Sequence, residues 1–180
     1  MANENKEFDI EAFRKAFNEG NLFPKGVGVQ VTVLREGYAE AELTLREDHM
    51  NFSGRVQGGV MLTLADCCAG AASRSYNVDI ATLEIKYNFI RGITVKGQTI
   101  KAVTQVIHPG RKTHVLESRI YDSDGKLAGI ATITNYVTGE LKSPVFVVEG
   151  EKDADSLHAL GYNAVSGEDG AGPGKWRKEY

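Results

Sequence analysis

The feature that most constrains the fold is an apolar run that follows a pair of glycines at positions 58 and 59. Its apolar side chains recur at intervals of three and four residues, at Val60, Met61, Leu64, Ala65 and Cys68. This spacing is typical of one face of an α-helix. The sequence therefore predicts a long, largely buried helix that begins near Gly58.

One residue does not suit such a helix. Asp66 lies about two turns into it, between Ala65 and Cys67. An ionised carboxylate is costly to bury unless it is paired or takes part in chemistry, which makes Asp66 a candidate catalytic residue. A solvent-exposed aspartate explains the same pattern, and this stretch alone favours neither interpretation.

The start of the helix is a candidate ligand site. Gly58 and Gly59 have no side chains, so a ligand can approach the free backbone N–H groups of the first turn. The helix dipole adds partial positive charge there, which suits an anion or a developing oxyanion. A tight loop is the plainer explanation of the two glycines.

Composition is that of an ordinary globular protein, because 42% of the 180 residues are hydrophobic and 25% are charged. A net charge of −3 argues against a nucleic-acid partner. No apolar run is long enough for a membrane span, and the polar N-terminus lacks a signal-peptide core, so we expect a cytoplasmic protein. We interpret Cys67 and Cys68 as core residues, and since His49 and His114 have no spaced partners we expect no metal site.

Alternating patterns on both sides of the helix predict strands. A first helix is expected at residues 10–19, capped by Asp9. After Pro24, two alternating segments flank a turn at Glu36 and Gly37. Four more strands are expected near residues 82–89, 99–107, 114–121 and 127–137. This order favours an α+β architecture, with a six-stranded antiparallel sheet and the long helix packed on one face.

Several residues of this frame carry a family resemblance: Asn51, Gly54, residues 56–60, 64–66 and 89–91, Gly97, Gly110, Arg111, Asp124 and Gly125. Together they resemble the hotdog fold, and within it the acyl-CoA thioesterases of the phenylacetate-degradation type. The resemblance covers roughly residues 20–138. This chain has Gln57 where the family most often has histidine, and glutamine can donate an N–H to a thioester carbonyl but cannot titrate.

The resemblance implies hydrolysis of acyl-CoA thioesters, with coenzyme A as part of the substrate and no other cofactor. The N–H of Gly58 and the side chain of Gln57 would then receive the oxyanion. Asp66 would act as general base or as nucleophile, and Asn51 would orient the water or the carbonyl. Thr82, on the strand after the helix, would face the site across a dimer.

The resemblance also implies substrate contacts at Gly59, Arg91 and Arg111, since arginine suits the phosphates of coenzyme A. It implies a homodimer or homotetramer in which each site joins the helix start of one subunit to the aspartate of the other. Tyr87 and Phe89 alternate with polar residues, and we expect them in the core instead of against the acyl group.

The pattern changes after Val137. Residues 145–148 predict a strand, residues 155–160 a short helix and residues 163–166 a second strand. This β-α-β fragment resembles the opening of a Toprim domain, but the chain stops before the Asp-x-Asp motif that would bind magnesium together with Glu149. We expect a hotdog thioesterase domain at residues 1–140 and an incomplete Toprim-like appendage at residues 141–180.

Two alternatives to an enzyme remain open. A non-catalytic acyl-CoA-binding protein can share this fold, because fold alone does not settle function. Such a binding protein has no need for Asp66 among apolar neighbours. The Toprim-like tail offers a role in nucleic-acid metabolism instead, and the missing acidic motif counts against it.

Overall fold

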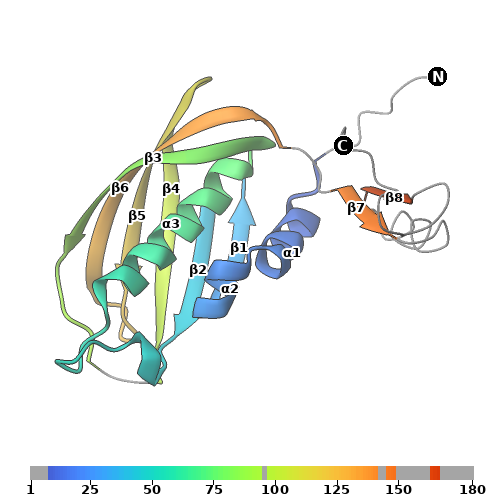
Figure 1. Cartoon of the computed structure of the whole chain (residues 1–180). Helices are drawn as coiled ribbons and strands as arrows, with labels where there is room; N and C mark the ends of the chain where they lie inside the picture. Colours follow the sequence, from blue (N-terminus) through green and yellow to red (C-terminus); the bar gives the residue numbers. More distant parts are fainter. Residues whose placement is uncertain (1–7, 95–96, 142–144, 149–162, 167–180) are drawn as a thin grey trace. The chain divides into compact units, whose positions relative to one another are not determined.

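The computed structural model describes residues 8–94, 97–141, 145–148 and 163–166. The chain divides into two compact units, Met1–Glu140 and Leu141–Tyr180. Figure 1 labels the elements of the first unit, which in chain order are α1 (Ile10–Gly20), α2 (Leu22–Val27), β1 (Val29–Arg35), β2 (Tyr38–Thr44), the 3-10 helix η1 (Glu47–His49), α3 (Gly58–Arg74), β3 (Val78–Phe89), β4 (Thr99–Pro109), β5 (Thr113–Tyr121) and β6 (Leu127–Glu140).

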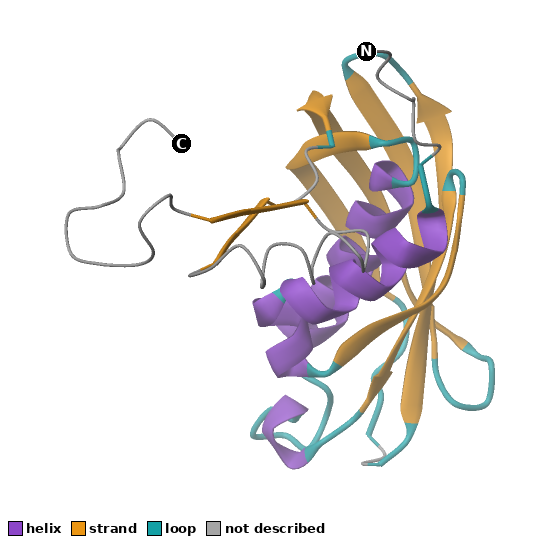
Figure 2. Ribbon diagram, turned by 90° about the vertical axis from the view of Figure 1, so that its right-hand side faces the viewer, coloured by secondary structure: helices purple, strands orange, loops and turns teal. Residues whose placement is uncertain are grey.

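Within the described residues, the first unit has one six-stranded antiparallel sheet with the strand order β1-β2-β4-β5-β6-β3. Helix α3 connects β2 to β3, which forms an edge of the sheet, so the helix runs across the sheet's inner face (Figure 1 and Figure 2). This arrangement confirms the predicted α+β architecture.

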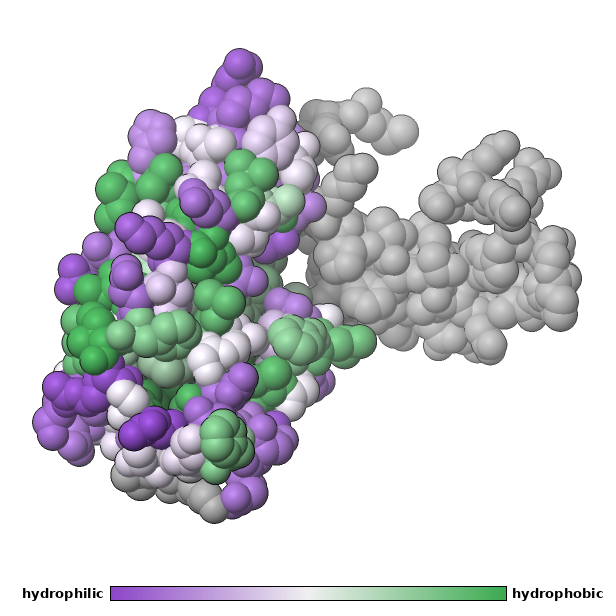
Figure 3. All heavy atoms as spheres, turned by 60° about the vertical axis from the view of Figure 1, so that its left-hand side comes forward, coloured by the Kyte–Doolittle hydropathy of each residue, from purple (hydrophilic) through white to green (hydrophobic). Residues whose placement is uncertain are grey.

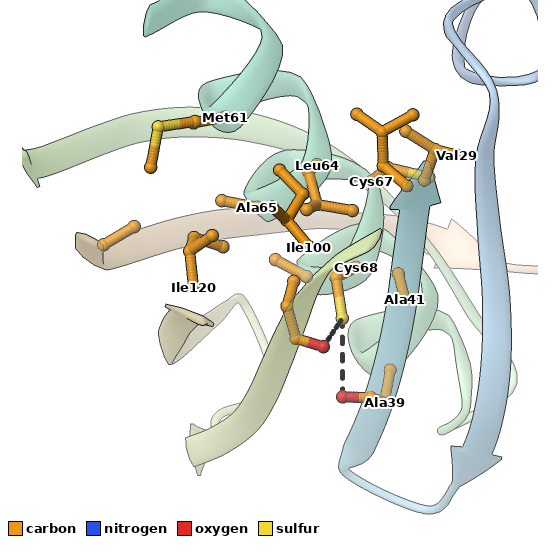
Figure 4. Close-up of a cluster of buried hydrophobic side chains, with 14 of the residues drawn as sticks. Val29, Ala39, Ala41, Met61, Leu64, Ala65, Cys67, Cys68, Ile100 and Ile120 are labelled. Atoms are coloured by element: carbon orange, nitrogen blue, oxygen red, sulfur yellow. Dashed lines mark hydrogen bonds between the residues drawn. The ribbon is translucent and has the colours of Figure 1, made fainter. Parts of the chain in front are cut away.

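Helix α3 begins at Gly58, as predicted, and most of its residues are buried against the sheet. Small side chains let it approach β2 and β4 closely, and the Sγ of Cys68 lies 3.4 Å from the carbonyl oxygen of Ala39 (Figure 4). Burial raises the pKa of the Cys68 thiol to about 12, which keeps it neutral. Cys67 and Cys68 are free and buried, which confirms that both belong to the core.

The N-terminal region has one helix that the sequence did not reveal. Helix α1 extends one residue beyond the predicted range, and the Asp9 side chain accepts a hydrogen bond from the N–H of Ala12, as expected of its cap. Helix α2 follows at once and contains Pro24, which a first helical turn tolerates. It ends at Gly28, whose φ of 98° is left-handed and favours glycine. Six residues are too few for a helical period to show in the sequence.

Strand β3 lies at an edge of the sheet and exposes apolar side chains. Leu83 is 60% exposed, Phe89 59% and Ile90 51%, and Figure 3 brings this side of the chain forward. The expected core position of Phe89 is therefore wrong for the single chain, because an edge strand lacks a neighbour on one side. Tyr87 does pack against the core.

The second unit contains strands β7 (Val145–Val148) and β8 (Asn163–Ser166), which pair in parallel. Both strands were predicted from the sequence. A parallel pair needs a crossover connection, as a β-α-β unit has. The expected helix at residues 155–160 and Glu149 lie outside the described residues.

Candidate active site

Asp66 and Thr82 form a hydrogen-bonded pair. The Oγ1 of Thr82 donates to Oδ1 of Asp66 over 3.0 Å within the same chain. The strand register shifts between Thr82 and Glu84, and such a bulge redirects side chains. Asp66 is half-buried instead of enclosed by apolar residues, whereas its neighbours Ala65 and Cys67 are buried.

The pair lies on an open pocket of about 270 Å³. One wall is a single face of α3, a second comes from α1 and α2, and β3 closes one side. The lining residues are Thr63, Asp66, Cys67, Gly70 and Arg74 of α3, Phe17, Phe23 and Pro24 of α1 and α2, Asn21 between these helices, and Ile80 and Thr82 of β3.

The thiol of Cys67 is a second candidate nucleophile on this pocket. Burial and, to a smaller extent, the negative charge of Asp66 raise the pKa of this thiol to about 12. Because the thiolate is the reactive form of cysteine, Cys67 is not a nucleophile at neutral pH. The carboxylate of Asp66 is therefore the group on this pocket that can accept a proton or attack.

The helix start is open to a ligand. Gln57 is the N-cap of α3, and its side chain makes no capping hydrogen bond, so the first-turn N–H groups need other partners. A Cβ at Gly58 would lie 2.9 Å from Cζ of Phe89, which places that aromatic ring directly against the helix start. A Cβ at Gly59 would meet nothing within 4 Å.

Asn51 shapes the loop before this helix. Its Oδ1 accepts hydrogen bonds from the N–H groups of Ser53, at 2.9 Å, and Arg55, at 3.1 Å. The N–H of Gln57 then donates to the carbonyl of His49. Asn51 thus holds the segment that leads to the helix start, and it does so through its side-chain oxygen.

A single chain does not bring the two halves of the predicted site together. Gly58 and Asp66 are eight residues apart on α3, which is ~12 Å along the helix axis at 1.5 Å per residue. One thioester carbonyl cannot reach both groups of the same helix. The helix start and the carboxylate are therefore separate features of the single chain.

The two predicted arginines are also far apart. Arg91 lies near the helix start, where the N–H of Val56 donates to the carbonyl of Ile93, and its guanidinium is 3.9 Å from the carboxylate of Asp122. Arg111 is exposed in the turn between β4 and β5. This turn adjoins the C-terminal end of α3. The ring of His114, at the start of β5, packs edge-on against the ring of Tyr76, which lies two residues after the end of α3.

The sequence did not reveal the pocket around Asp66. Thr63, Cys67, Gly70 and Arg74 share its helix face at spacings of three and four, a signal that was present but hidden within an apolar run. The wall from α1 and α2 leaves no such signal, because it depends on contacts between distant segments.

Among the described residues, no three His, Cys, Asp or Glu side chains gather as they would around a metal ion. In the same part of the chain, no helix combines the length and apolar character that crossing a membrane requires.

Comparison with known proteins finds similarity to thioesterases. Residues 53–128 match the family model of the thioesterase superfamily. The chain is 25% identical to the acyl-coenzyme A thioesterase PaaI of Escherichia coli, over 64% of this chain and 81% of that protein. It is 27% identical to the 1,4-dihydroxy-2-naphthoyl-CoA hydrolase of Listeria monocytogenes, over 60% of this chain and 89% of that enzyme.

Solved thioesterase structures share the fold of this domain. The E. coli PaaI structure superposes with a TM-score of 0.70 at 23% identity and covers 73% of this chain and 94% of its own. A hypothetical thioesterase of Streptococcus pneumoniae, solved with coenzyme A, has a TM-score of 0.61 at 24% identity, over 64% and 89% of the two chains. The fold is the hotdog fold, as the sequence predicted.

Proposed function

We propose that this protein hydrolyses acyl-CoA thioesters to a free acid and coenzyme A. The observation that carries the proposal is the Asp66–Thr82 pair on an open pocket of a domain that is similar to thioesterases. The PaaI relative and the coenzyme A bound to the pneumococcal structure support acyl-CoA as the substrate.

In the proposed reaction, a water oxygen attacks the thioester carbonyl carbon while Asp66 takes a proton from that water. The hydrogen bond from Thr82 holds the carboxylate in position. The resulting oxyanion accepts hydrogen bonds from the N–H of Gly58 and the side chain of Gln57. Collapse of the tetrahedral intermediate breaks the C–S bond, and the departing thiolate receives the proton from Asp66.

Direct attack by Asp66 on the carbonyl is the alternative route to the same products. It expels the coenzyme A thiolate and forms a mixed anhydride, which water then hydrolyses. A single turnover in ¹⁸O-labelled water tests this route. Label in the Asp66 carboxylate establishes the nucleophilic route, whereas label in the released acid alone arises by either route and calls for chemical trapping of the anhydride.

The separation within α3 supports a site shared between two subunits. We propose a homodimer in which the helix start of one subunit meets Asp66 of the other. The exposed apolar side chains of β3, such as Leu83 and Phe89, support an interface at this edge, because long sheet edges are rarely left bare. In an antiparallel dimer, Arg111 of one subunit would also approach the helix start of the other.

Two variants of the pneumococcal thioesterase have replacements with the same spacing as the pair. Two structures of that protein replace an aspartate and a threonine with alanine, at positions sixteen residues apart. Asp66 and Thr82 have the same separation in this chain.

Turnover of an acyl-CoA panel by Asp66→Asn tests the proposed function. Loss of a general base should lower kcat by ~10²–10⁴ without loss of the fold. Asp124→Asn is the matched control, because Asp124 lies in an exposed turn with Lys126 as its partner. Near-parental hydrolysis by Asp66→Asn would refute the mechanism. Tight binding of acyl-CoA without hydrolysis by the parent would favour a non-catalytic binding protein.

Complementation tests the shared site. Asp66→Asn and Gly58→Val are each expected to be inactive, because one lacks the base and the other crowds the helix start. Co-expression should restore roughly a quarter of the parental activity, since random pairing makes half of the dimers mixed and each mixed dimer has one intact site. No recovery would refute the shared site.

A further inference from the structure

Arg74 lies on the pocket wall in the last turn of α3. Its Nη2 donates to Oδ1 of Asp79 over 3.0 Å and to the carbonyl of Ile80 over 3.1 Å. The side chain is only 23% exposed. Guanidinium has five N–H donors, and within the described part of the chain no partner is found for those on Nε and Nη1. A partly buried donor gains free energy when it finds an acceptor.

The guanidinium folds back along the helix toward Asp66. A Cβ at Gly70 would lie 3.2 Å from Nη1 of Arg74, so the charged group sits at the level of Gly70. Gly70 is four residues beyond Asp66, a separation of ~6 Å along the helix axis. A short acyl chain whose carbonyl lies at Asp66 can therefore reach Arg74 with its far end.

The pocket between these two groups has both polar and apolar walls. Phe17 and Ile80 contribute hydrocarbon, Thr63 is polar, and the Cys67 thiol is neutral. Asp79, which also accepts the N–H of Ile80, holds the arginine in place. The pocket thus offers a carboxylate at one position, room for a short acyl chain and then unused N–H donors.

We propose that Arg74 is a specificity-determining residue that binds an oxygen acceptor at the end of the acyl group remote from the thioester. The inference rests on the proposed function, in which this pocket takes the acyl group. A terminal carboxylate and a terminal hydroxyl both supply such an oxygen. The substrates are acyl-CoA thioesters of this oxygenated class.

Three CoA esters of equal chain length test the proposal: hexanoyl-CoA, 6-hydroxyhexanoyl-CoA and adipoyl-CoA. The parent should have a kcat/KM for at least one oxygenated ester that exceeds the value for hexanoyl-CoA about tenfold or more, as expected for a hydrogen bond to a charged group. The oxygenated ester whose kcat/KM exceeds that of hexanoyl-CoA by the larger factor shows whether a hydroxyl or a carboxylate is the preferred acceptor. Arg74→Met should bring the ratio close to one.

Two other variants separate recognition from structural damage. Gly70→Ala retains the arginine, but its new Cβ would lie 3.2 Å from Nη1 and shift the guanidinium by a few tenths of an ångström, so the ratio should fall although alanine favours the helix. Arg119→Met is the control, because Arg119 is paired with Glu117 on β5 outside the pocket lining, and the ratio should not change. A parent without preference for oxygenated esters, or an unchanged ratio in both Arg74→Met and Gly70→Ala, would overturn the proposal.

Calorimetric binding of the three esters distinguishes this inference from the proposed function. It uses Asp66→Asn, whose turnover should be lowered by ~10²–10⁴, alone and combined with Arg74→Met. The oxygenated ester should bind about tenfold more tightly than hexanoyl-CoA, and Arg74→Met should remove the difference. A parent that hydrolyses nothing would refute the enzyme, whereas equal binding of the three esters would refute the role of Arg74.

Discussion

Asn18 attaches helix α1 to the edge strand β1, and its replacement by alanine tests how the pocket wall is held. The Nδ2 of Asn18 donates to the carbonyl of Val31 over 2.9 Å, and Oδ1 accepts the N–H of the same residue over 2.9 Å. Arg14 donates to the same carbonyl. No residue of α1 is fully buried, so these polar contacts matter for its position.

The cost of Asn18→Ala follows from these contacts. Each partly buried hydrogen bond contributes ~1 kcal/mol, so losing two lowers the free energy of unfolding by ~2 kcal/mol. Alanine recovers a few tenths of a kcal/mol through its helix propensity. The carbonyl of Val31 keeps Arg14 as a partner, whereas its N–H loses the one that Asn18 supplied. For a chain of this size, the melting temperature should fall by ~4–8 °C.

Urea denaturation and thermal melts of the full chain measure the loss. Glu19→Ala is the control, because Glu19 is exposed on the same helix, and it should change stability by less than ~0.5 kcal/mol. Since Phe17 precedes Asn18 and lines the pocket, KM for acyl-CoA should also rise in Asn18→Ala. Parental stability and KM in this variant would refute the inference that Asn18 holds the wall.

Two further predictions concern pH and the second unit. Burial lowers the pKa of His114 from its ordinary value of 6.5, so the folded state favours neutral imidazole. The free energy of unfolding should therefore fall as the pH drops below about 6.5, and His114→Gln should flatten this slope in urea titrations on either side of that pH. Deletion of residues 141–180 should leave hydrolysis unchanged and the melting temperature within a few degrees; an aggregated or inactive product would place the domain boundary elsewhere.

Local patterns in the sequence were sufficient for the main elements of the fold. The apolar spacing after Gly58 placed the start of α3 correctly, because a period of 3.6 residues is a property of consecutive residues. Alternation and β-branched composition located the six strands of the sheet for the same reason, with differences at their ends. Asp66 was recognisable as a candidate because burying a carboxylate costs free energy, and its apolar neighbours can be identified from the sequence itself.

The surroundings of Asp66 depend on contacts between distant segments. Whether its carboxylate is enclosed or faces a pocket is set by the packing of α1, α2 and β3 around α3, and the sequence therefore left it open. The exposure of Phe89 follows from the position of β3 at the sheet edge. The accessible donors of Arg74 arise because Gly70, one turn away, leaves space for its guanidinium. Sheet order and long-range packing decide these features, and no short window of sequence contains them.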